Sequence, residues 1–199
     1  MANRTNPDRG QLDPDRDTDH TGPVSVIRYD TAPEQPWRNG RGVTRELHTG
    51  PGWRLSIATL DRAGPFSTFP GLDRVFIVAG GQVELDVEGT TRSLTLGDQQ
   101  RFPGEATIHV DPGTGPAFAV NVMSTRTSHI AEVRVTRIDG PAPEASALVV
   151  LQGRVDVDGT PLTPFDAAMP ARAARGFDAL VVLITVRPSG TEPPVSDSR

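Results

Sequence analysis

Apolar residues alternate with polar ones, or form short runs, along most of the chain between residues 24 and 187, and Gly, Pro or Asp ends each run. This pattern is typical of short β-strands joined by turns. We expect strands over residues 24–29, 43–48, 53–61, 74–79, 82–87, 92–96, 106–110, 117–123, 130–138, 147–151, 154–157 and 179–186. The helical signal is weak, because residues 170–175 have little amphipathic length and Gly176 ends them. The pattern therefore predicts an all-β fold.

The second half of this strand pattern repeats the first half. Four segments recur in the same order at an offset of about 62 to 72 residues: 75–85 with 147–157, 94–98 with 162–166, 102–103 with 169–170, and 117–123 with 179–185. In this alignment Gly81 matches Gly153. A two-fold repeat of short antiparallel strands predicts two β-barrel or jelly-roll lobes that pack together and cover each other's sheet edges.

The repeat and the composition together predict the boundaries of two lobes and two terminal tails. Residues 23–128 are expected to form an N-terminal lobe and residues 129–187 a C-terminal lobe. The segments 1–22 and 188–199 are polar and hold few apolar residues, so they cannot offset the entropy that ordering would cost. We therefore expect both segments to be disordered tails.

The amino-acid composition excludes several catalytic groups and argues against two classes of binding partner. All twenty basic residues are Arg and the chain has no Cys, which excludes Schiff-base lysines, thiolate nucleophiles and disulfides. The net charge of −5 argues against binding to nucleic acid or to an anionic membrane, because both draw on a broad basic surface. The first 22 residues lack the apolar core of a signal peptide, so we expect a cytoplasmic protein.

Arginines nevertheless concentrate in one part of the chain. They include Arg38, Arg41, Arg45, Arg54 and Arg74. Such a cluster repels itself unless carboxylates or a bound anion lie between the guanidinium groups. The carboxylates available in the same stretch are Glu34, Glu46, Asp61 and Asp73. Internal ion pairs and a bound anion therefore both remain open.

Strand alternation suggests where a ligand would bind. Arg54 and Ser56 share one face of a predicted strand, and the apolar residues next to them share the other. Either face could line the lobe; we interpret the polar face as the lining and the apolar face as the contact between lobes. Asn121 stands among apolar neighbours and needs a polar partner, whereas its repeat match, Leu183, is apolar. The pocket is therefore expected in the first lobe, and the second lobe is expected to be structural.

Three motifs in fixed order resemble one protein family. They are PW-x-NG-x-G-x-T-x-E at residues 36–46, WRLSIA at 53–58 and GPFS-x-FPG-x-DR at 64–74. This order resembles the HutD/Ves family, double cupins associated with bacterial histidine-utilisation genes. The resemblance covers about residues 24–126 and continues more weakly to residue 187.

The family motif falls on Trp37, Asn39, Gly40, Gly42, Thr44, Glu46, Arg54, Ser56, Phe66, Phe69, Pro70, Gly71, Asp73, Arg74, Asn121, Met123 and Arg126. One position departs from it, since the family usually has glycine where this chain has Arg41. If that position had a positive φ, Arg41 would either be strained by about 1–2 kcal/mol or force a rearranged turn.

This chain does not have the metal-binding residues of metal-binding cupins at the corresponding positions. These positions fall near Thr68, Pro70, Arg74 and Thr107, and Pro and Arg offer no side-chain ligand. His109 lies close to the last of these positions but is alone, whereas a stable site needs three or four donors. We therefore expect no metal and no other cofactor.

The resemblance implies a metal-free binding module, and the Arg cluster supports it independently. The ligand would be a small anionic metabolite, with formimino- or formyl-glutamate as candidates, and the role would be to regulate or buffer histidine utilisation. The candidate ligand-binding residues are Trp37, Asn39, Thr44, Glu46, Arg54, Ser56, Phe69, Arg74, Asn121 and Met123. The apolar walls of the pocket would be Phe66, Phe69 and Met123.

Two other functions stay open. In the first, the chain is a metal-independent cupin isomerase or epimerase, in which Glu46 or Asp73, with a pKa raised by burial, acts as the general base. In the second, the chain is an interaction protein that uses its sheet faces. A homodimer formed through the second lobe is compatible with each of these functions.

Overall fold

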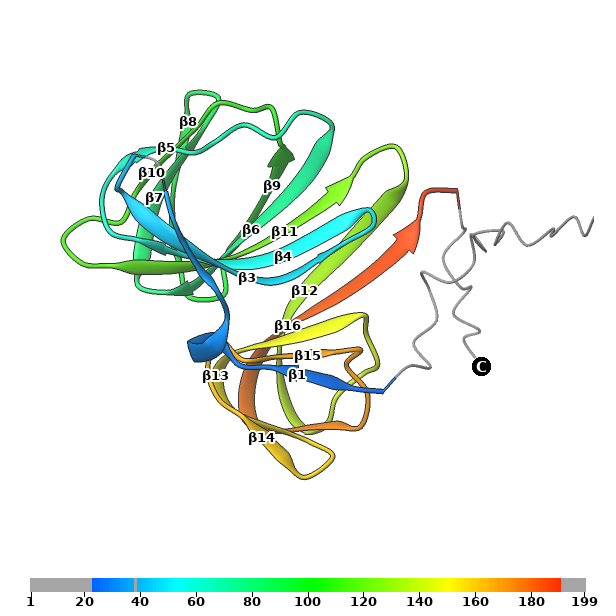
Figure 1. The fold of residues 1–199 in the computed structure, drawn as a ribbon. Helices are drawn as coiled ribbons and strands as arrows, with labels where there is room; N and C mark the ends of the chain where they lie inside the picture. Colours follow the sequence, from blue (N-terminus) through cyan, green and yellow to red (C-terminus); the bar gives the residue numbers. More distant parts are fainter. Residues whose placement is uncertain (1–22, 38, 191–199) are drawn as a thin grey trace, which may run out of the picture.

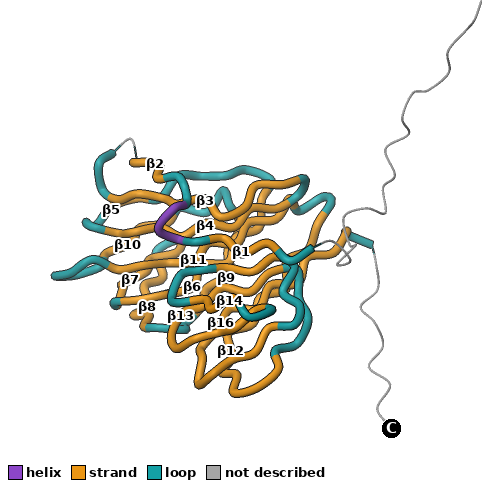
Figure 2. The backbone as a smooth tube through the Cα atoms, turned by 60° about the horizontal axis from the view of Figure 1, so that its bottom comes forward, coloured by secondary structure: helices purple, strands orange, loops and turns teal. Residues whose placement is uncertain are grey.

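The computed structural model describes residues 23–37 and 39–190, so Arg38 and the tails expected at 1–22 and 191–199 lie outside the described residues. Two lobes of antiparallel β-sheet pack against each other (Figure 1). The 3-10 turn η2 (Tyr29–Thr31) is the single helical element of the described residues and is purple in Figure 2. The predicted all-β double-cupin fold is confirmed.

The first lobe contains two sheets. The larger sheet has the order β2 (Glu34–Pro36), β3 (Gly42–Gly50), β4 (Trp53–Leu60), β11 (Ala117–Thr125), β6 (Leu72–Gly80) and β9 (Gln99–Pro103). The smaller sheet has the order β5 (Gly64–Pro65), β10 (Ile108–Asp111), β7 (Gln82–Val87) and β8 (Thr90–Thr95). Both sheets enclose an apolar cluster that includes Phe76, Leu85 and Phe102.

The second lobe is built from one sheet. Its order is β1 (Ser25–Ile27), β15 (Ala167–Met169), β13 (Ala147–Val157), β16 (Ala174–Pro188) and β12 (His129–Pro141), with β14 (Thr160–Leu162) paired to β13. Figure 1 shows β1, in blue, beside β15 in the lower lobe. The strand β1 thus belongs to the second lobe, whereas the sequence pattern assigned it to the first. The reason is that Val24 and Val26 pack against the apolar cluster inside the second lobe.

The end of the second lobe also differs from the expectation. The strand β16 extends to Pro188. The backbone N–H of Ser189 then donates to the carbonyl oxygen of Ser128 at 2.8 Å. Residues 188 and 189 are therefore part of the folded lobe, and not of the tail that was predicted to start at 188.

A third apolar cluster lies between the lobes. It brings Leu55 and Ile57 of β4 together with Val149 of β13. Because neighbouring strand residues point to opposite faces, Arg54 and Ser56 point away from this cluster and into the first lobe. The interpretation that the apolar face of β4 joins the lobes is therefore confirmed.

The short strands β2, β5, β9, β14 and β15 were not predicted. They have two to five residues each, which is too short for a clear period of apolar residues. Two predicted strands, 147–151 and 154–157, are one strand, β13, whose pairing with β16 shifts register on either side of Gln152. The weak helical signal at 170–175 gives no α-helix, and among the described residues no helix has the length and apolarity to cross a membrane.

The matched glycines confirm the internal repeat. Gly81 has a φ of 73° and Gly153 a φ of 80°. A Cβ atom on Gly81 would lie 2.9 Å from the carbonyl oxygen of Pro116, and one on Gly153 would lie 2.5 Å from that of Asp178. In each copy, the glycine thus allows the backbone to bend, between β6 and β7 at Gly81 and within β13 at Gly153, while another backbone passes close by.

This close approach predicts a difference between two glycines of the second lobe. Gly153 and Gly159 both have a φ of 80°, but a Cβ atom on Gly159 would have no neighbour within 4 Å. We expect Gly159→Ala to lower the free energy of unfolding by about 1–2 kcal/mol through backbone strain. Gly153→Ala should lower it by about 1–3 kcal/mol more, through overlap with the passing strand. Urea denaturation measures both values, and equal losses would contradict the close approach.

Candidate functional site

A cavity of about 500 Å³ opens within the first lobe. It lies between the inner face of the larger sheet and two segments at its mouth, residues 35–37 with Asn39 and residues 65–67 with Phe69. The lining residues are Gln35, Pro36, Trp37, Asn39, Thr44, Arg54, Ser56, Ala58, Pro65, Phe66, Ser67, Phe69, Arg74, Asn121 and Met123. The structure thus brings together nine of the ten residues named from the sequence, all except Glu46.

Strand register explains why these residues meet. Asn121 of β11 lies opposite Ser56 of β4, and Met123 lies opposite both Arg54 of β4 and Arg74 of β6. Three neighbouring strands therefore direct polar side chains to one face at the same level of the lobe.

Arg74 is the buried charge of this cavity. The residue is 6% exposed, and its Nε and Nη2 atoms donate to Asn121 Oδ1 at 3.0 and 2.6 Å. Its guanidinium carbon lies 4.4 Å from the ring centre of Phe66 and 5.5 Å from that of Phe102. Within residues 23–37 and 39–190 no carboxylate forms an ion pair with it. Burial lowers the pKa of Arg74 to about 9.

Arg54 is the second cation that lines the cavity, and it is more exposed. Its Nη2 atom lies 2.6 Å from Glu46 Oε2, and the Arg54 side chain is 39% exposed. A hydrogen bond from the Thr49 hydroxyl, helped by Arg54 and opposed by burial, lowers the pKa of Glu46. The expectation that burial raises the pKa of Glu46 is therefore wrong, because its hydrogen bonds outweigh its burial.

Asp73, the other expected base, points away from the cavity. Alternation along β6 sends it outward, where its Oδ1 atom lies 2.7 Å from Arg126 Nε and its side chain is 55% exposed. Arg126 also pairs with Glu105 at 2.8 Å, and this hydrogen bond is the largest of the effects that lower the pKa of Glu105 to about 2. Arg126 Nη2 also donates to the carbonyl oxygen of Leu72 at 3.0 Å. This network lies at the start of β6, just after the segment that carries Phe66 and Phe69, so the contacts of Asp73 are made outside the cavity.

Trp37 forms a wall at the mouth. Its indole Nε1–H donates to Thr44 Oγ1 at 2.8 Å, and its ring lies edge-on to Phe66 with centres 5.7 Å apart. The Trp37 backbone N–H donates to the carbonyl oxygen of Gly42 at 2.9 Å. Because Phe66 in turn covers Arg74, Trp37 and Arg74 are linked through one aromatic ring.

Arg41 does not have the backbone strain that a positive φ would cause. The positive φ, 64°, belongs to Gly40, whereas Arg41 has no positive φ. The backbone N–H of Arg41 donates to Asn39 Oδ1 at 3.1 Å, and its side chain donates to the carbonyl oxygen of Ala63. Arg41 therefore links the turn that follows Trp37 to Ala63, the residue that precedes β5.

Five lining residues were missed by the sequence reasoning: Gln35, Pro36, Ala58, Pro65 and Ser67. Each of them adjoins or lies within one of the three motifs, which was the available signal. Ala58 could also have been found from alternation, because it follows Arg54 and Ser56 on the same face of β4.

The positions of the metal-binding cupin pattern hold no cluster of donors. Thr68 and His109 are exposed, and Arg74 occupies the cavity with a positive charge. In the part of the chain that the structure describes, no group of three or more His, Cys, Asp or Glu residues is arranged to hold a metal ion.

Comparisons with known proteins agree with this fold and these motifs. An uncharacterized 21.2 kDa protein in the hutC 3′ region of Pseudomonas putida is 37% identical over 94 residues, which are 43% of this chain and 50% of that protein. The protein Ves of Citrobacter koseri is 36% identical over 112 residues, which are 52% of this chain and 59% of that protein. The chain thus spans between half and three fifths of the length of these curated relatives.

A solved structure is similar over a larger share of the chain. HutD from Pseudomonas fluorescens, described for a formate condition, has a TM-score of 0.69 and 27% identity, covering 83% of this chain and 100% of that one. The HutD family model matches residues 29–181, which is more than half of the sequence. The chain therefore belongs to the HutD family.

Proposed function

We propose that the first-lobe cavity binds a small metabolite through its carboxylate, and that this binding regulates or buffers histidine utilisation. The observation that carries the proposal is Arg74, a buried guanidinium with an amide oxygen and aromatic rings around it but no carboxylate among the described residues. The buried charge of Arg74 is therefore the feature that an anion would complete.

Electrostatics favours an anion at this place. Taking a cation out of water costs several kcal/mol unless an opposite charge offsets the loss. The amide oxygen of Asn121 offers Arg74 only a partial negative charge, and cation–π contacts contribute about 0.5–2 kcal/mol. A carboxylate bound to the guanidinium of Arg74, which is itself buried, would add charge-assisted hydrogen bonds.

The second cation supports a ligand with two carboxylates. Arg74 is buried while Arg54 is partly exposed, so the cavity offers positive charge at two depths. N-formyl- and formimino-glutamate are dicarboxylates of this kind. The comparisons support the setting, since one relative lies in a hutC region and a related HutD structure is described for a formate condition, formate being the simplest carboxylate.

Calorimetric titration with N-formyl-L-glutamate tests this proposal. We expect saturable 1:1 binding to the full chain, with weaker binding of formate. Arg54→Ala should weaken binding of N-formyl-L-glutamate about 10- to 100-fold, since a hydrogen bond to a charged group contributes about 1.5–3 kcal/mol. Arg134→Ala, which removes an exposed arginine of β12 in the other lobe, is the control and should bind as the unchanged chain does. Binding that is absent, or equal in both variants, would contradict the proposal.

If the buried charge of Arg74 is kept for ligand binding, it should lower the free energy of unfolding of the ligand-free chain. We expect the double variant Arg74→Met/Asn121→Leu, which gives position 121 the residue of its repeat match Leu183, to lose binding. The variant should nevertheless be as stable as the unchanged chain or more stable, by up to about 1–4 kcal/mol. The single variant Arg74→Met should be less stable than the double one by about 1–3 kcal/mol, because it leaves Asn121 Oδ1 unpaired.

Chemical denaturation of the unchanged chain, Arg74→Met, Asn121→Leu and the double variant provides the full thermodynamic cycle. A double variant several kcal/mol less stable than the chain would show that Arg74 serves the fold, and the charge argument for a ligand would then fail.

A further inference from the structure

The repeat places the same turn at corresponding points of the two lobes. In the first lobe, Asp98 Oδ2 accepts hydrogen bonds from the backbone N–H and the hydroxyl of Thr95, at 2.9 and 3.0 Å. In the second lobe, Asp166 Oδ2 accepts the same two bonds from Thr163, both at 3.1 Å. The two aspartates thus make the same hydrogen bonds within their turns. A contact that one of them makes in addition is therefore not required by the turn itself.

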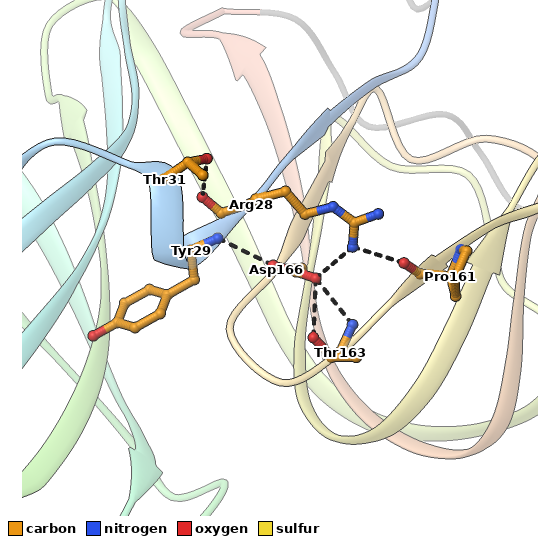
Figure 3. A network of polar contacts seen from close by, with 6 residues as sticks. All are labelled: Arg28, Tyr29, Thr31, Pro161, Thr163 and Asp166. Carbon is orange, nitrogen blue, oxygen red and sulfur yellow. Dashed lines mark hydrogen bonds and ion pairs between the residues drawn. The ribbon is translucent and has the colours of Figure 1, made fainter.

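Asp166 has such a further role. It is 4% exposed, whereas Asp98 is exposed. Its Oδ1 atom accepts the backbone N–H of Tyr29 at 3.0 Å, and its Oδ2 atom lies 2.8 Å from Arg28 Nη1 (Figure 3). Burial by itself would raise the pKa of Asp166, but the hydrogen bonds from Thr163, Tyr29 and Arg28 lower it. The turn of the second lobe therefore holds a segment from the start of the described chain.

The backbone of this turn is also specialised. Position 97 in the first copy is glycine, with a φ of 89°, but its counterpart Phe165 has a φ of 77°, in the left-handed region that favours glycine. The Phe165 ring stacks on Phe118 with centres 5.0 Å apart and lies 5.1 Å from the ring of Tyr29. Strained backbone of this kind persists only where surrounding contacts fix it, and here these contacts reach both lobes.

The segment held by Asp166 leads to the cavity. We call residues 28–37 the crossing segment, because it runs from the end of β1 in the second lobe through β2 in the first. Arg45 of β3 binds the middle of this segment, donating to the Ala32 carbonyl oxygen at 2.7 Å and to Glu34 at 2.7 Å. Its last residues, Gln35, Pro36 and Trp37, line the cavity.

We infer that the Thr163–Asp166 turn of the second lobe is a latch that holds the crossing segment and thereby positions the Trp37 wall of the first-lobe cavity. Asp166 is then a positioning residue for ligand binding in the other lobe, although it does not line the cavity. The effect on the ligand rests on the proposed function, whereas the effect on Trp37 does not. The second lobe therefore regulates how well the site is formed.

The repeat supplies the matched control for a test. Asp166→Asn keeps the size of the side chain but removes the charge that faces Arg28, and places an NH₂ group or a neutral oxygen against several donors. Asp98→Asn makes the same change at the equivalent turn, where the hydrogen bonds of Asp98 to the described residues are with Thr95 and Val78 and not with the crossing segment. The readout is the indole N–H signal of Trp37 in ¹H–¹⁵N NMR spectra of the full chain, assigned by comparison with Trp53→Phe.

We expect Asp166→Asn to shift or broaden the Trp37 indole signal and to weaken binding of N-formyl-L-glutamate about tenfold. Asp98→Asn should leave the signal in place and keep the affinity within about twofold. A merely structural Asp166 would lower the melting temperature without moving the Trp37 signal. If Asp166→Asn does not fold, Arg28→Met, at a side chain that is 39% exposed, removes the same ion pair more mildly.

The two proposals fail in different ways. If the unchanged chain does not bind N-formyl-L-glutamate, the proposed function is wrong, and the Trp37 signal still tests the latch. If the chain binds but Asp166→Asn, or Arg28→Met in its place, alters neither the Trp37 signal nor the affinity, the latch is wrong. Equal effects of Asp98→Asn and Asp166→Asn would also overturn the latch, since among the described residues it is Asp166, and not Asp98, that bonds to Arg28 and Tyr29 of the crossing segment.

Discussion

The apolar contact between the lobes places the polar residues of the cavity. On β4, β11 and β6, every second residue packs into the cluster shared by both lobes, as Leu55 and Val120 do. The residues between them must face the opposite way, so that Ser56, Asn121 and Arg74 enter the first lobe. A slip of one residue would place the guanidinium of Arg74 in the contact between lobes and leave the cavity apolar. The hydrophobic contact that holds the protein together thus also fixes the register on which its chemistry depends.

The two lobes use the inner faces of their sheets differently. In the first lobe Asn121 accepts hydrogen bonds from Arg74, and a cavity of about 500 Å³ lies beside them. In the second lobe the matching Leu183 belongs to an apolar cluster together with Leu148 and Val181. An apolar interior releases more free energy on folding than a polar one. The second lobe is therefore suited to stabilise a first lobe whose interior is costly to form.

Sequence reasoning succeeded where period and repeat carry the information. The faces of β4 and β11 follow from alternation, and the contrast between Asn121 and Leu183 is enough to assign the cavity to the first lobe. It missed Gln35 and Pro65, because their segments have no period and tertiary contacts set their direction. The lowered pKa of Glu46 could not be predicted from the sequence either, because it depends on contacts with the Thr49 hydroxyl and with Arg54. The pairing of β1 with the second lobe depends on contacts with residues about 140 positions later, which no local pattern encodes.

Energetics explains why the second lobe keeps a strained turn. Phe165, at a φ of 77°, carries a cost of about 1–2 kcal/mol relative to a glycine at that position. Its two aromatic contacts, with Phe118 and Tyr29, contribute about 0.5–1.5 kcal/mol each. The two contacts together offset this cost, and the Tyr29 contact supplies about half of the offset. Tyr29 is in turn held through its backbone N–H by Asp166. The turn and the crossing segment therefore stabilise each other, which couples the position of the cavity wall to the packing of the opposite lobe.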